Sequence, residues 1–266
     1  MGTSGSYSGS GGKAGRDLRS GLGNWLDSVP EAGGTDTAEN GSQVPVRLPP
    51  ATLAPAIQLL RPRSTSGGRG DGPSGGAGAG EGPTGRAGGG PIRSAPRVAA
   101  SAGRAAAAAY AFRVADVAGL QDLGLDYREL SSLGPLDVTR RIVEMACGPR
   151  SNSTIEDGEE RYVAAEVAEW ILERDDGGAP PTPDEIVRET IAIIISEVVE
   201  TEVGEMLRTD ERPEWASQLA EGQIREAAEI LAGRAQLTAS GVTHADFARS
   251  IEDGIETLRR ILGGRA

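Results

Sequence analysis

Glycine is distributed so unevenly along this chain that the sequence divides into two parts before any helix is assigned. Of the 39 glycines in 266 residues, 24 lie in residues 1–96, and the tract 63–91 is dominated by Gly, Ala, Pro, Ser and Arg. So little apolar surface cannot offset the entropy lost when such a chain becomes ordered. The pattern therefore predicts a long disordered, Gly-rich N-terminal region, with the folded part after it.

Charge follows the same division. Residues 1–96 carry nine Lys and Arg against seven Asp and Glu, whereas residues 97–266 carry 18 against 32. A surface this acidic repels phosphate backbones and anionic lipids. We therefore expect neither direct nucleic-acid binding nor membrane binding, and a protein partner would need a basic face.

The chain has few residues for metal or disulfide chemistry. Cys147 is the only cysteine and His244 the only histidine, which excludes an intrachain disulfide and a structural zinc site. The N-terminus lacks the apolar segment of a signal peptide, so none is expected, and the most apolar run, 191–199, is too short to span a membrane. A cytoplasmic protein without a metal is expected.

One less polar segment interrupts the front region at 16–60. Its apolar residues recur at helical spacing before Pro30, which predicts a short amphipathic helix at 16–29; they are Leu18, Leu22, Trp25, Leu26 and Val29. An isolated helix of this length is marginal in water. Two interpretations stay open: a transient helix in a low-order segment, or a linear element that orders against a partner with Trp25 as its anchor.

The remaining 170 residues predict an all-α, multi-helix bundle at 97–266, separated from the front by a linker at 61–96 and from the extreme N-terminus by a flexible tail at 1–15. The run of alanines at 105–109 would let another backbone approach closely. Thr182 and Glu185 form a capping box before a helix that is apolar on nearly every face, so this helix should be central. The expected helical segments are 96–124, 126–148 with a break at Gly134–Pro135, 159–176, 184–208, 213–237 and 243–264.

Catalytic patterns are weak. A dyad of Cys147 and His244 has no local signature around either residue. The acidic pairs Glu159–Glu160 and Asp175–Asp176 are of a kind that binds divalent cations, but pairs at helix ends are mostly solvated. The sequence thus predicts a non-enzymatic protein without catalytic or metal-binding residues.

The N-terminus itself carries a chemical feature. Gly2 is small enough for methionine aminopeptidase to remove Met1, which leaves a free α-amine on an uncrowded tail. The first six residues also fit the myristoylation pattern. Abundant Ala, Gly and Arg, with Lys13 as the only lysine, indicate a GC-rich bacterial gene, and bacteria generally lack that acylation.

The opening MGTSGSYSGSGGKAG, followed by ASAGRAAAAAYAFRVADVAGLQDLGLDYREL and LDVTRRIVEMACG, resembles the QatB-like proteins of the Qat anti-phage defence system. The most specific part is MGTSxSYxGxGG. In those operons the companions are an ATPase, an enzyme similar to the 7-cyano-7-deazaguanine synthase QueC, and a TatD-like nuclease.

The resemblance implies that the tail is a substrate. A QueC-like enzyme would join a 7-deazaguanine carboxylate, after ATP activation, to the amine of Gly2. The following residues would be recognition contacts; they are Thr3, Ser4, Gly5, Ser6 and Tyr7. The helical domain would serve as an interaction module. The linker at 61–96 departs from the resemblance, so no fixed distance between tail and bundle is expected.

Two other readings stay open on the sequence alone. One is an unmodified helical scaffold or adaptor with an idle, disordered N-terminus. The other is an enzyme that uses Cys147 or an acidic cluster.

Overall fold

The fold is all-α, as the sequence predicts. A computed structural model describes residues 9–29, 47–62, 93–148, 154–174, 179–208, 214–237 and 241–263. Within these ranges it contains ten α-helices, one short 3₁₀-helix and no β-strand. Most of the front region expected to be disordered lies outside the described residues.

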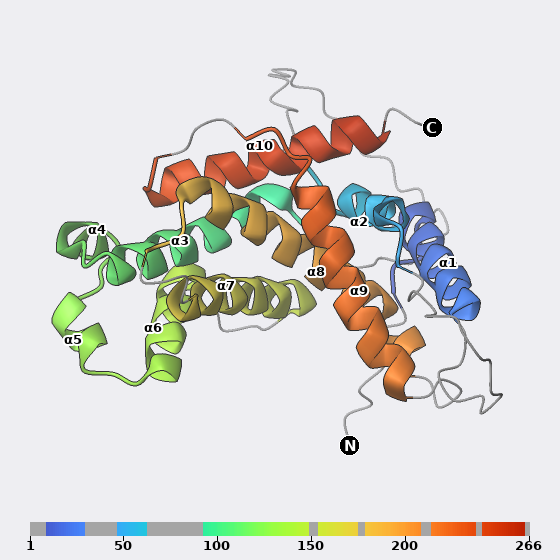
Figure 1. The fold of residues 1–266 in the computed structure, drawn as a ribbon. Helices are drawn as coiled ribbons and strands as arrows, with labels where there is room; N and C mark the ends of the chain where they lie inside the picture. Colours follow the sequence, from blue (N-terminus) through green and yellow to red (C-terminus); the bar gives the residue numbers. More distant parts are fainter. Residues whose placement is uncertain are drawn as a thin grey trace, which may run out of the picture.

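The central helix is α8, Pro183–Leu207. Thr182 caps it through the expected box, because its hydroxyl accepts from the Glu185 N–H while the Glu185 carboxylate accepts from the Thr182 N–H at 2.8 Å. The next turns are buried on almost every side, and Ile194 is only 1% exposed. Figure 1 shows α8 running through the middle of the molecule, with contacts to α7, α9 and α10.

Helices α3, Ala95–Arg113, and α10, His244–Gly263, pack closely against each other. A Cβ at Gly103 would lie 2.7 Å from the Ala248 nitrogen and 2.9 Å from the His244 carbonyl oxygen. The alanines that follow Gly103 are buried as well. The close backbone approach is therefore at Gly103, just before the alanine run at which it was expected.

The other side of α3 is covered by α7, Ile155–Glu173, and α6, Pro135–Cys147. Two short helices, α4 (Val117–Asp122) and α5 (Tyr127–Ser131), connect α3 to α6 and lie at one end of the molecule (Figure 1). The break before Pro135 is as expected. Helix α9, Glu214–Ala232, packs on α8.

The segment 16–60 differs from the expectation of low order. Helix α1, Lys13–Ser28, the 3₁₀-helix η1, Pro50–Leu53, and α2, Ala54–Leu59, belong to the same hydrophobic core as the C-terminal helices. Leu18 and Leu22 are fully buried. The apolar stripe of α1 therefore has its partner within the chain, on α2 and α8 at the opposite end from α4 and α5 (Figure 1).

The two ends of the Gly-rich tract meet. Arg61 donates its N–H to the Arg93 carbonyl at 2.7 Å, and Ala95 donates to the Arg61 carbonyl at 2.9 Å. An isolated parallel bridge pairs Arg61 with Ser94. The tract 63–92 therefore leaves and re-enters the fold at one place. It does not separate the N-terminal segment from the bundle, which corrects the linker expected at 61–96.

In the described part of the chain, no helix combines the length and apolarity that crossing a membrane requires.

Candidate functional site

A buried cation, Arg93, joins the start of α3 to α7 and α8. Its Nε donates to Glu159 Oε2 at 2.9 Å and its Nη2 to Glu159 Oε1 at 2.7 Å, a bidentate pair. Its Nη1 donates to Glu202 Oε1 at 2.6 Å. The side chains of Arg93 and Glu202 are 1% and 0% exposed. Removal of one partner from such a group leaves an uncompensated buried charge, which typically costs about 3–5 kcal/mol.

Burial alone would lower the pKa of Arg93. The hydrogen bonds and charges of Glu159 and Glu202 outweigh that effect, so the pKa is raised and the guanidinium stays charged. Two carboxylates share this cation. Arg93 contacts Glu202 through Oε1, and the second oxygen, Oε2, accepts from other donors.

One of these donors is the backbone of the N-terminal tail. The Ser10 N–H donates to Glu202 Oε2 at 2.7 Å, across 192 residues of sequence. Arg19 on α1 closes the arrangement, because its Nη2 donates to the Ser10 carbonyl at 2.9 Å while its Nη1 lies 3.3 Å from Glu202 Oε2. Arg16 donates to the Gly11 carbonyl at 2.6 Å. We call Ser10, Arg19 and Glu202 the N-terminal clamp.

Two glycines make the clamp sterically feasible. Gly9 has φ +83°, and a Cβ there would meet the Arg19 guanidinium and lie 2.9 Å from the Glu202 carbonyl oxygen. Gly15, inside α1, faces Ser10: a Cβ would meet the Ser10 hydroxyl and lie 2.7 Å from its carbonyl oxygen. The backbone at Gly9 and Ser10 therefore lies against α1 and α8 without intervening side chains.

A second set of ion pairs lies one helical turn along α3. Arg97 contacts Asp157 and Glu160 of α7, and the Ser101 hydroxyl donates to Glu160 at 3.2 Å. Asp157 also completes a capping box with Thr154. Glu159 and Glu160 are thus buried structural ion pairs, which corrects the expectation that this acidic pair is solvated.

Helices α7 and α8 each contain more Asp and Glu than Arg and Lys, so several of their carboxylates lie near other carboxylates. Burial raises the pKa of Glu197 to about 7, helped by the charges of Glu159 and Glu200. Burial, with Glu166, Glu200 and Glu197, raises the pKa of Tyr162 to about 12. In the described residues no group of His, Cys, Asp and Glu is arranged to hold a metal ion.

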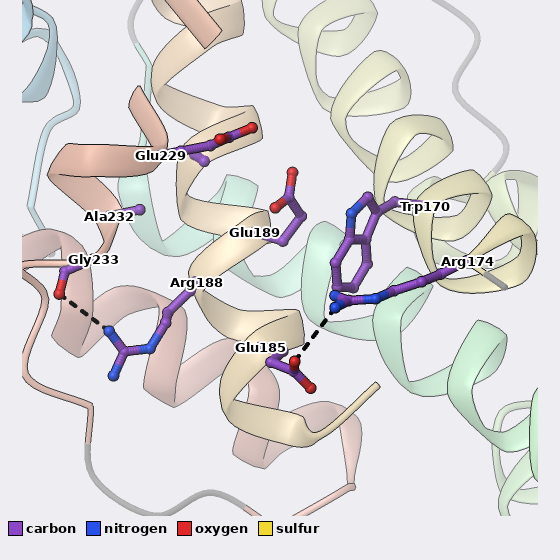
Figure 2. A pocket seen from close by; sticks show the side chains of 9 residues that line it. Trp170, Arg174, Glu185, Arg188, Glu189, Glu229, Ala232 and Gly233 are labelled. Atoms are coloured by element: carbon purple, nitrogen blue, oxygen red, sulfur yellow. Dashed lines mark hydrogen bonds and ion pairs between the residues drawn. The ribbon is translucent and has the colours of Figure 1, made fainter. Parts of the chain in front are cut away.

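A pocket of about 180 Å³ lies between α7, α8 and α9. Figure 2 shows the side chains that line it. The arginines that line it contact neighbouring groups. The Arg174 guanidinium lies 4.8 Å from the Trp170 ring centre and 3.4 Å from the Glu185 carboxylate. Arg188 donates to the Gly233 carbonyl at 3.1 Å. The pocket is smaller than the roughly 300 Å³ at which small-molecule sites begin. We interpret these contacts as fastening the three helices together.

The residues predicted from sequence are placed as follows. The acceptor Gly2 and the recognition residues Thr3, Ser4, Gly5, Ser6 and Tyr7 lie outside the described residues, as do Asp175 and Asp176. Trp25 is 5% exposed and belongs to the chain's own core. It is therefore not an exposed partner anchor, because the bundle already occupies its apolar face.

Cys147 and His244 are in different surroundings. Cys147 is buried at the end of α6, and its Sγ lies 3.8 Å from the Glu160 carbonyl oxygen. His244 is exposed at the first residue of α10. Nothing in this placement supports a dyad.

Arg93, Glu202 and Ser10 were not singled out from the sequence. One signal was available: Glu202 follows Ile195, Val198 and Val199 by seven, four and three residues, so it falls on a buried stripe of α8. A carboxylate there requires a cation. The sequence did not reveal that cation, because Arg93 lies 109 residues from Glu202. The contact with the Ser10 N–H spans 192 residues and was equally hidden.

No family model, curated protein or solved structure matches this chain.

Proposed function

We propose that this protein is a non-enzymatic, cytoplasmic component of a bacterial anti-phage defence system of the Qat type. Its N-terminal glycine would be the acceptor for a 7-deazaguanine-type acyl group, attached by a QueC-like partner enzyme. The bundle would dock that enzyme. The ATPase and the TatD-like nuclease of the same operon are further candidate partners.

The observation that supports this proposal best is the N-terminal clamp. Ser10 is held at both its N–H and its carbonyl, so the tail meets the bundle at Ser10 and Gly2–Ser8 precede that point. The clamp would give the residues before it a fixed point of departure from the bundle, as a tail offered to a docked enzyme requires. The resemblance of the opening residues to QatB-like proteins supplies the chemistry.

The chemistry is consistent with an α-amine. The deazaguanine carboxylate would attack the α-phosphate of ATP, which gives an acyl-adenylate and releases pyrophosphate. The amine nitrogen of Gly2 would then attack the acyl carbon, AMP would leave and the nitrogen would lose a proton. An α-amine has a pKa near 7.7–8.0, so a substantial fraction is unprotonated near neutral pH, unlike a lysine with a pKa of about 10.4.

The chain offers a simple internal control for this reaction. After Met1 is removed, its primary amines are the α-amine of Gly2 and the Nζ of Lys13, whose side chain is 86% exposed. Lys13→Arg therefore leaves the α-amine as the single primary amine. Gly2→Glu blocks both Met1 removal and access to the amine.

The test is intact-protein and N-terminal peptide mass spectrometry after expression with and without the QueC-like enzyme. The native chain and Lys13→Arg should gain the same mass, and Gly2→Glu should gain none while its thermal unfolding is unchanged. Phage protection should be lost in Gly2→Glu alone. If Gly2→Glu protects cells at normal abundance, the proposal is wrong and the unmodified-scaffold alternative stands.

A further inference from the structure

We propose that Glu202 and Arg19 are positioning residues: they grip the backbone at Ser10 and so fix the length and origin of the peptide arm that carries the acceptor amine. This inference rests on the proposed function and deepens it, because it says how far from the bundle the partner's active site must lie.

The grip is on the backbone. Glu202 accepts from the Ser10 N–H and Arg19 donates to the Ser10 carbonyl. The Ser10 hydroxyl, by contrast, is buried without a hydrogen-bond partner in the described part of the chain. The clamp thus holds one point of the chain by its main-chain groups, and the side chains before Gly9 are not part of it.

The grip is also rigidly supported. Glu202 is fully buried and held from its other oxygen by Arg93, which is itself paired with Glu159. Three elements, α1, α8 and the start of α3, therefore fix one carboxylate. Because the tract 63–92 is closed at its base by Arg61 and Ser94, its length has no influence on the position of the clamp.

The arm ahead of the clamp has a limited reach. Seven residues, Gly2–Ser8, precede Gly9. At 3.3–3.6 Å per fully extended residue they span at most about 25 Å. The active site of the docked partner must accordingly lie within about 25 Å of the place where Gly9 meets α8. Release of the clamp would extend the arm to Gly12.

A tether's effective concentration falls roughly as the −3/2 power of its length once it spans the gap. Lengthening the arm from seven to 11 residues by releasing the clamp should slow modification about twofold at saturating enzyme. Inserting 14 Gly/Ser residues between Ser8 and Gly9 triples the arm and should slow it about fivefold. The same insertion between Gly75 and Gly76 should have no effect.

Two matched pairs of variants test the clamp without replacing any of its charged residues, and in each pair one change disturbs the clamp and the other is its control. Gly15→Ala places a methyl group against Ser10, whereas Gly23→Ala, on the same helix, has its nearest neighbour 3.9 Å away. Gly9→Ala forces a residue with a side chain into φ +83°, whereas at Gly12 a Cβ meets nothing within 4 Å. Both changes in α1 raise helix propensity, and Gly23→Ala should leave thermal stability unchanged or slightly higher. Gly15→Ala also loses the buried hydrogen bonds of the clamp, so its thermal melt is recorded and the rates are compared at a temperature where both variants are fully folded.

The experiment combines two measurements on the full chain. Amide hydrogen exchange at Ser10 should be slow in the native protein and in Gly23→Ala, and fast in Gly15→Ala. Single-turnover modification by saturating QueC-like enzyme, followed by intact mass, should slow in Gly15→Ala and in Gly9→Ala, but not in Gly23→Ala or Gly12→Ala. The enzyme concentration at half-saturation should not change, because the bundle sets docking.

The outcomes separate the two proposals. Fast exchange at Ser10 in the native protein, or equal modification rates in Gly15→Ala and Gly23→Ala, overturns the positioning role while leaving modification at Gly2 intact. A slowly exchanging Ser10 in a native chain that gains no mass overturns the proposed function, and the positioning role with it.

Discussion

Glu197 carries a carboxylate that the fold drives towards its protonated form. Burial is the main cause, and the negative charges of Glu159 and Glu200 add to it; a hydrogen bond from the Thr201 hydroxyl and the charge of Arg93 act in the opposite direction. The resulting pKa is about 7, well above the ordinary glutamate value of 4.5. Ionisation of Glu197 therefore works against the folded state.

We expect the free energy of unfolding to carry this signature. For an acid whose pKa is higher in the folded state, the stabilising contribution is complete below the unfolded pKa and is lost as pH rises through about 7. Glu197→Gln should thus stabilise the protein at pH 8 by roughly 1–3 kcal/mol and flatten its stability between pH 5 and 7.

Urea denaturation at a series of pH values would measure this effect. Glu256→Gln is the exposed control, because that side chain is 61% exposed in a surface pair with Arg259. An identical pH profile for Glu197→Gln and the native chain would show that the carboxylate of Glu197 is solvated.

Contacts between residues close in sequence could be predicted from the sequence, whereas contacts between distant residues could not. Thr182 and Glu185 are three residues apart, so their capping box is visible in sequence and is confirmed. Arg93 sits at the end of the Gly-rich tract, where arginine usually indicates a solvated linker, and only the fold shows that it is 1% exposed between two glutamates. Trp25 was misplaced for the same reason: its partner surface is distant in sequence.

Among the elements, the closed base of the tract 63–92 has the clearest consequence. Arg61 and Arg93 hold the two ends of a 30-residue excursion together. Deletion of residues 68–87 leaves ten residues to connect the same two points. Because loop-closure entropy grows with the logarithm of loop length, the shortened protein should be more stable by about 1 kcal/mol.

Chemical denaturation of the deletion variant would test this expectation, with unchanged circular dichroism as evidence of the same helical content. A loss of cooperative unfolding would mean that the deleted residues contribute to the core.

The sequence predicted helix α1 itself but not the surface on which it packs. Its apolar spacing and the stop before Pro30 gave a helix at 16–29, and the structure has Lys13–Ser28. A helix of 16 residues is marginal alone. Its stability comes from packing on α2 and α8, and periodicity does not reveal which surface receives a stripe.

The whole molecule is a single core that begins before residue 97. The bundle predicted at 97–266 omits Arg93, α1 and α2, whose residues share one hydrophobic cluster with the C-terminal helices. A fragment 97–266 would also keep Glu159 and Glu202 buried without their cation. We expect it to be less stable than the full chain by at least 3–5 kcal/mol.

The matched control is the fragment 9–266, which retains the clamp and should unfold like the full chain. Thermal melts followed by circular dichroism would compare the two fragments. Equal midpoints would show that α1, α2 and Arg93 are dispensable to the fold.

The clamp also has a consequence in time. Ser10 is made early, but Glu202 is 192 residues further along the chain. At 5–20 residues per second, the ribosome needs about 10–40 s to synthesise that interval. Throughout this period the nascent N-terminus has no carboxylate to hold it, so methionine aminopeptidase meets an unrestrained end. We therefore expect removal of Met1, which the proposed modification requires, to precede closure of the clamp on Ser10.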